Sequence, residues 1–230
     1  MIHKAGIQRA LGHFSYLLVA LLAFFLVVPL LPEGSTQTLG ELLALSAVLL
    51  ASIYALHGSR STFTIGIAVI VPALAGKWMS FFTDHYFLFS LSRGFVILLF
   101  LMTTWRLIRY LWLENEVTAD TLYGAVSAYL LLGLIFGTAY SIVESITPGS
   151  FANLPTPEEV GPVLAASTSV ALDYFSMVTL TTLGYGDVTP LSQMARSLAV
   201  FEAVVGQFYL AVLVARLVGL FMAGRSASKS

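Results

Sequence analysis

A polar segment of seven residues, Thr181–Asp187, interrupts the hydrophobic second half of the chain. It reads Thr-Thr-Leu-Gly-Tyr-Gly-Asp, so its two glycines, Gly184 and Gly186, stand at alternate positions. The apolar segment before it, 165–180, is too short to cross a bilayer, whereas a long one, 194–222, follows it. Backbone that is not helical survives at membrane depth only where it is buried in protein or lines water. The sequence therefore predicts a re-entrant loop between a half-helix and a spanning helix.

The composition of the whole chain is that of a membrane protein. Of its 230 residues, 58% are hydrophobic and 10% are charged, compared with about 25% charged residues in soluble domains. The chain has no cysteine, which excludes disulfides and thiolate metal sites, and no basic run that would bind nucleic acid. We expect an all-α membrane protein that crosses the bilayer six times, at residues 14–31, 39–56, 63–82, 86–107, 121–143 and 194–222.

The polar segment resembles the potassium-channel signature T-x-G-Y-G-D, with Leu183 where the commonest version has Val. The resemblance extends through residues 174–179 and 202–207 and covers about the last half of the chain. It indicates the voltage-gated-like superfamily, as a six-span prokaryotic-type subunit with few charges on its fourth helix. It implies a four-helix sensor-like domain at 1–113 and a pore domain at 114–230. In the pore domain it implies an outer helix (121–143), a turret (144–164), a pore helix (165–181), a selectivity filter (182–186) and an inner helix (194–222).

A filter of this kind replaces the water that a cation sheds with backbone oxygens, as potassium-channel filters are known to do. The resemblance implies K⁺ sites at Thr182, Leu183, Gly184 and Tyr185, with Gly186 completing the strand. Positive φ angles at the two glycines would turn the carbonyls toward one axis, and Tyr185 is expected to point outward into the protein. A ring needs four strands and the chain has one, so we expect a homotetramer. Its other partners are K⁺ ions and the lipid bilayer, and no further cofactor is expected.

Three residues are candidates for bracing the filter: Tyr174, Thr179 and Asp187. In similar channels an aromatic residue at the position of Tyr174 hydrogen-bonds the aspartate. The alternative is a solvated Asp187 with an unrelated tyrosine. Phe175 stands where many such channels have Trp, which removes a second hydrogen bond to Tyr185.

The inner helix carries two residues that need an explanation. Gly206 is either a gating hinge or a point of close helix packing. Glu202 is costly in lipid and must face protein or water, either bonded to hydroxyls of the half-helix or titrating as part of a gate. Asp173 in the half-helix has the same two interpretations, and Arg216 is expected near the inner mouth.

The first four helices do not carry the charges of a steep voltage sensor, which needs about three to four per subunit. The fourth span has Arg93 alone within its apolar length, while Arg106 and Arg109 are placed to anchor lipid phosphates. No acidic residue occurs from Leu42 through Thr83, so we expect the second and third helices to supply no carboxylate that could pair with a moving arginine. Lys77 is expected to reach the membrane surface. We therefore predict little or no voltage dependence.

The distribution of basic residues predicts that both termini are cytoplasmic and that the protein lies in the plasma (inner) membrane. With that orientation, Asp187 faces outside. The cytoplasmic side then holds eight of the 11 basic residues: Lys4, Arg9, Arg60, Arg106, Arg109, Arg216, Arg225 and Lys229.

The leading interpretation is a potassium channel that conducts passively and is not an enzyme. The alternatives are a non-selective cation channel and a non-conducting regulatory subunit of a channel complex. The acidic pair Glu158–Glu159 in the turret either concentrates cations or is a solvated loop. Too few residues follow the sixth span for a ligand-sensing domain, so the sequence indicates no gating stimulus.

Overall fold

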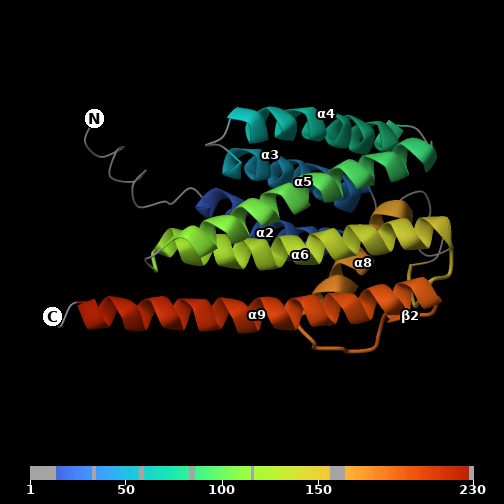
Figure 1. The fold of residues 1–230 in the computed structure, drawn as a ribbon. Coiled ribbons are helices and arrows are strands. Elements are labelled where there is room, and N and C mark those ends of the chain that lie inside the picture. The colour runs from blue at the N-terminus through green and yellow to red at the C-terminus, as the bar shows by residue number, and fades with distance from the viewer. Residues whose placement is uncertain are drawn as a thin grey trace.

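The computed structural model of the chain describes residues 14–32, 35–56, 60–82, 86–114, 117–155 and 164–227. Figure 1 shows long helices that run roughly side by side, with α9 along one edge. The elements in chain order are α2 (Ser15–Val27), the 3-10 helix η1 (Val28–Leu30), α3 (Ser35–Ala55), α4 (Arg60–Phe82), α5 (Tyr86–Leu113), α6 (Ala119–Ile146), β1 (Phe151–Ala152), α8 (Leu164–Leu180), β2 (Thr189–Pro190) and α9 (Gln193–Ala227). The acidic pair Glu158–Glu159 lies outside the described residues.

Five helices among the described residues, namely α3, α4, α5, α6 and α9, are long and apolar enough to cross a membrane. The chain is accordingly a multi-pass, helical membrane protein. The first predicted span, 14–31, is shorter than expected, because the α-helix ends at Val27 and continues only as η1. Pro29 has no N–H to donate to the Phe25 carbonyl, so α-helical hydrogen bonding cannot continue there.

The largest difference in helix boundaries is at the end of α5. This helix runs to Leu113 instead of the predicted 107, since no glycine or proline interrupts the intervening residues. Only residues 114–118 then connect it to α6, which begins with a capping box formed by Thr118 and Thr121. Helices α5 and α6 are thus antiparallel neighbours (Figure 1).

One apolar core joins α2–α5 to α6. Its fully buried members include Leu21, Leu49, Leu99 and Leu131, one each from α2, α3, α5 and α6. The apolar span of α6 is 67% buried, whereas that of α9 is only 11% buried. Helix α9 packs on α6 and α8 along one side (Figure 1), so most of its apolar surface is uncovered in the single chain.

The ion pair between Lys77 and Glu41 overturns two predictions. The Lys77 Nζ atom in α4 lies 2.6 Å from Glu41 Oε1 in α3, and the side chains are 15% and 4% exposed. Lys77 therefore does not reach for the membrane surface. Glu41 lies in α3, one residue before the stretch 42–83 that has no acidic residue, so the second helix does supply a carboxylate. The pair neutralises two charges inside the bundle, where either charge alone would be costly.

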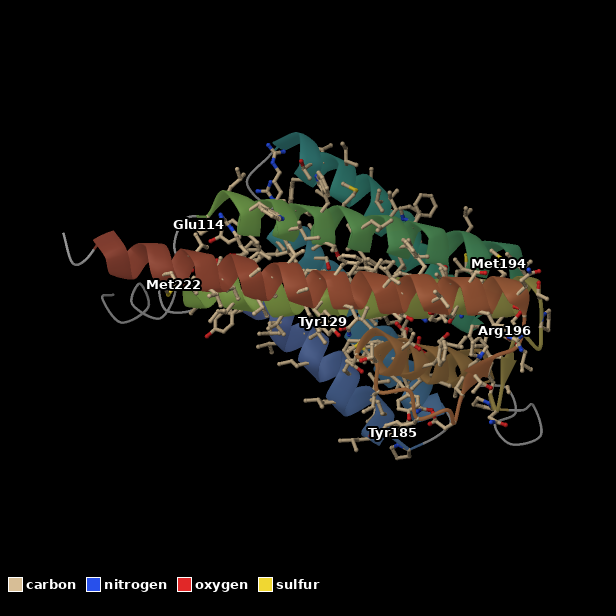
Figure 2. All side chains as sticks on the ribbon, turned by 60° about the horizontal axis from the view of Figure 1, so that its bottom comes forward. Glu114, Tyr129, Tyr185, Met194, Arg196 and Met222 are labelled. Atoms are coloured by element: carbon tan, nitrogen blue, oxygen red, sulfur yellow. The ribbon has the colours of Figure 1, made fainter. Side chains whose placement is uncertain are left out.

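Arg216 joins the C-terminal part of α9 to the end of α5. Its Nη2 donates to the carbonyls of Trp112 and Glu114, at 3.0 Å each, and its Cζ lies 5.6 Å from the centre of the Trp112 ring. These carbonyls have no partner within α5 because they end the helix. Figure 2 shows Glu114 and Met222 at one end of the molecule and Met194 and Arg196 at the other. Arg216 therefore caps a helix at the end where α9 finishes.

Gly137 allows α8 to lie against α6. A Cβ atom added there would lie 2.9 Å from the Cα of Asp173 and would also collide with its carboxylate. Any side chain at this position therefore forces the two helices apart.

We expect Gly137→Ala to lower the stability by about 1–3 kcal/mol, the usual cost of overpacking. The measurement is the thermal unfolding midpoint of the purified protein in detergent. Gly94→Ala in α5 is the matched control, because an added Cβ meets nothing within 4 Å there. Equal midpoints for the two variants would contradict this account of the α6–α8 contact.

Candidate functional site

The segment that follows α8 has an unusual backbone. Its φ angle is positive at three alternate residues, Thr182 (+59°), Gly184 (+59°) and Gly186 (+78°). The sequence predicts this for the glycines, which adopt positive φ at little steric cost. The sequence does not predict a positive φ for Thr182, because a β-branched side chain makes this conformation an outlier. Strain of this kind concentrates at functional sites, which identifies this strand as the candidate site.

The start of the strand is folded back onto the end of α8. The N–H groups of Leu183 and Gly184 both point to the Val178 carbonyl, at 2.9 and 3.4 Å, and Thr182 N–H donates to Thr179 O at 2.9 Å. Thr179, one of the candidate bracing residues, thus contacts the strand through its backbone carbonyl. The last turn of α8 sets where the strand begins.

The strand itself is uncovered in the single chain. All residues from Thr181 to Asp187 are exposed, with Leu183 at 56% and Tyr185 at 68%. Figure 2 shows Tyr185 out on the loop, away from α9. The expectation that Tyr185 packs into the protein is therefore not met within one chain. The Phe175 ring packs against the rings of Tyr140 and Phe151, with ring centres 5.1 and 5.4 Å apart.

The far end of the strand is held from α8 and from the turret. Tyr174 Oη donates to Asp187 Oδ2 at 2.6 Å, and Asn153 Nδ2 donates to the Asp187 carbonyl at 2.8 Å. The hydrogen bond from Tyr174 lowers the pKa of the Asp187 carboxyl below its ordinary value and raises the pKa of Tyr174 to about 12. Tyr174 and Asp187 are thus brought together, as the family resemblance implies.

The turret contributes residues that the sequence does not single out. Glu144 at the end of α6 accepts the N–H groups of Gly149 (2.7 Å) and Phe151 (3.2 Å) with its two carboxylate oxygens. Phe151 then pairs with Pro190 in the two-residue ladder of β1 and β2. The signals available in the sequence were Gly149 and Asn153, residue types that tolerate the positive φ found at both positions.

The C-terminal end of α8 is fixed by α6 and α9. Tyr129 Oη from α6 donates to the Leu180 carbonyl at 3.1 Å. A Cβ added to Gly206 in α9 would lie 2.5 Å from the same oxygen, and α9 is helical on both sides of this glycine. Of the two interpretations of Gly206, close packing is the one supported by these contacts.

Glu202 lies where α6, α8 and α9 meet and has no exposed surface. Tyr140 Oη from α6 donates to its Oε2 at 2.5 Å, and its Oε1 is hydrogen-bonded to Ser176 Oγ of α8. Ser176 Oγ also lies 2.7 Å from the Gly133 carbonyl of α6. Glu202 thus contacts a hydroxyl of the half-helix, one of its two predicted environments.

Arg93 connects α5 to α6 and α8. This buried side chain of α5 donates to the Ser141 carbonyl of α6 and to Ser169 Oγ of α8, at 2.8 Å each. The carboxyl group of Asp173 lies within electrostatic range of Arg93, Lys77 and Glu41. Asp173 of α8 therefore lies near two basic side chains, of α5 and α4, and one acidic side chain, of α3.

The comparisons with known proteins concern the part of the chain that carries this site. A family model described as "Ion channel" matches residues 125–223, from α6 to α9. Protein LctB of Bacillus caldotenax is 34% identical over 104 residues, which are 45% of this chain and 75% of LctB. No solved structure gives a significant match.

The hydrogen bond from Tyr174 makes a pH prediction for Asp187. Because the pKa of Asp187 is lowered, the stability contributed by this bond is present above the ordinary value of 3.8 and is lost only as the pH falls through the lowered one. Tyr174→Phe is expected to raise the pKa of Asp187, as seen in a carboxyl-carbon NMR titration. Asn153→Ala removes only the bond to the Asp187 carbonyl and serves as the control. An unchanged midpoint in Tyr174→Phe would show that the tyrosine does not stabilise the carboxylate.

Proposed function

The chain belongs to the ion-channel family, and we propose that it conducts potassium ions passively through a filter made of residues 182–186. The observation that carries the proposal is the positive φ at Thr182, Gly184 and Gly186. Alternating φ signs let successive carbonyls of a strand face one side, which is the arrangement that replaces the hydration shell of K⁺. On this proposal, K⁺ is coordinated by the carbonyls of residues 182–185, and the Thr182 hydroxyl completes the inner end.

The proposal requires four copies of the chain. One strand offers a single column of oxygens, whereas a dehydrated ion needs oxygens on all sides. Two surfaces of the lone chain support assembly, namely the exposed filter strand with Tyr185 and the apolar face of α9 that includes Phe208, which is 68% exposed. Neighbouring subunits packed on these two surfaces would bury the apolar face of α9 and would supply the packing that the Tyr185 side chain lacks in one chain. The C-terminal ends of four α8 helices would add partial negative charge beneath the filter.

We place both termini in the cytoplasm and the protein in the plasma (inner) membrane. Arg106, Arg109 and Arg216 belong to the C-terminal parts of α5 and α9, toward the end marked by Glu114 and Met222 in Figure 2. Positive charge collects on the cytoplasmic side of membrane proteins. In this orientation Asp187 and the turret form the outer mouth.

The proposed channel is not steeply voltage-gated. A gating charge must move through the membrane field, and about three to four are needed per subunit. Arg93 is instead tied to α6 and α8 of the same chain, and Lys77 is paired with Glu41. Moving either would break buried polar contacts.

Flux through liposomes that contain only the purified protein tests conduction and selectivity together. We expect K⁺ flux to exceed Na⁺ flux by about tenfold or more, equivalent to about 1.4 kcal/mol. Comparable fluxes would favour a non-selective cation channel, and no flux would favour a non-conducting subunit.

Gly186→Ala is expected to abolish the K⁺ flux, since alanine disfavours the φ of +78° found there. The matched control is Gly219→Ala in α9, where an added Cβ meets nothing within 4 Å and flux is expected to persist. Full flux in Gly186→Ala would contradict a filter built on that residue.

Patch-clamp recordings test the absence of a sensor. The conductance–voltage curve is expected to be far shallower than three to four charges per subunit would give, with the same slope in Arg93→Gln. The control is Arg106→Gln, which also removes a positive charge from α5 but leaves the buried hydrogen bonds of Arg93 in place. A steep curve that Arg93→Gln flattens would identify Arg93 as a gating charge.

A further inference from the structure

The surroundings of Glu202 contain one hydrogen atom fewer than an ionised carboxylate would need. Ser176 Oγ lies within hydrogen-bonding distance of two oxygens, the Gly133 carbonyl and Glu202 Oε1. A serine hydroxyl has a single hydrogen. If Glu202 were ionised, the Ser176 hydrogen could point to only one of these two oxygens. In the other contact, two hydrogen-bond acceptors would face each other with no hydrogen between them. Tyr140 does not relieve this, since its hydroxyl is already directed at Oε2.

A proton on Glu202 satisfies every contact in the cluster. Glu202 Oε1–H donates to Ser176 Oγ, the Ser176 hydroxyl donates to Gly133 O, and the Tyr140 hydroxyl donates to Oε2. Each short oxygen–oxygen contact then contains one hydrogen. Buried polar networks persist when all of their members are satisfied.

The charges around Glu202 also favour the neutral form. Its side chain has no exposed surface, and no Lys, Arg or His of the described residues forms an ion pair with it. The titratable side chains facing it are Tyr140 and Tyr129, both from α6, while α8 contributes the non-ionising Ser176. A buried carboxylate without a cationic partner is strongly disfavoured relative to a neutral carboxylic acid.

We propose that Glu202 is held as a neutral carboxylic acid and is a positioning residue. Its proton completes the chain of hydrogen bonds that ties α9, through Ser176, to α8 and α6. Ser176 precedes the strand by less than two helical turns, so this chain fixes the inner helix to the segment from which the filter strand begins. The protonation state follows from the contacts alone, while the effect on ion flow rests on the proposed function.

Infrared difference spectroscopy of wild type against Glu202→Gln tests the protonation state. At neutral pH we expect the substitution to remove a C=O stretch of a protonated carboxyl group and to leave the carboxylate bands unchanged. Glu144→Gln is the control, because both Glu144 oxygens accept backbone N–H groups and its substitution should remove carboxylate bands. Loss of carboxylate bands in Glu202→Gln would overturn the proposal.

Rescue by the isosteric amide tests the positioning role. The glutamine side chain can donate to Ser176 and accept from Tyr140, so Glu202→Gln is expected to keep K⁺ flux within about threefold of wild type. Glu202→Ala leaves both hydroxyls without that partner and is expected to reduce flux about tenfold or more. Equal losses in the two variants would overturn the positioning role. Absence of flux in wild type would count against the proposed function, while the infrared bands would still decide the state of Glu202.

Discussion

Non-helical backbone inside a membrane protein must find partners for its N–H and C=O groups within the protein, and the rest of this structure depends on that constraint. Helix α8 stops at Leu180, short of a full crossing, and residues 181–187 after it form no backbone ladder with another described strand. At the end of α8, the Val178 carbonyl accepts the N–H groups of Leu183 and Gly184. The Tyr129 hydroxyl donates to the Leu180 carbonyl. At the other end, the side chain of Asn153 holds the Asp187 carbonyl. A short strand with an unusual backbone is thus fixed at both ends by other parts of the chain.

Helix α8 is fixed by polar side chains from several directions. Arg93 reaches it from α5, Glu202 from α9, and the Gly133 carbonyl of α6 meets its Ser176 hydroxyl. Buried groups of this kind are costly when a partner is missing, so the helices that provide them cannot shift independently. Helix α5, with the helices packed around it, therefore supports α6 and α8. The short α5–α6 connection and the Arg216 cap on α5 extend that support to the far end of α9.

Much of the fold and part of the site were predictable because their signals are local. Long apolar segments predicted the spanning helices, and the alternate glycines predicted the positive φ at Gly184 and Gly186. The contact between Tyr174 and Asp187 was predicted only through the family resemblance. The Lys77–Glu41 pair was missed because its partners lie on different helices, and the anchoring of Arg93 was missed for the same reason. Their pairing depends on how the helices are rotated and aligned, which one sequence read along its length does not specify.

The sequence by itself determined that the chain lies in a membrane, where most of its helices run, and where a non-helical segment interrupts them. These properties follow from hydrophobic length and from the conformational freedom of glycine, both of which act over a few neighbouring residues. The tertiary structure decided the close approach of Gly206 to the Leu180 carbonyl and the hydroxyl partners of Glu202. Each of these depends on atoms that meet across helices distant in sequence, because close packing and buried hydrogen bonds are satisfied only in three dimensions.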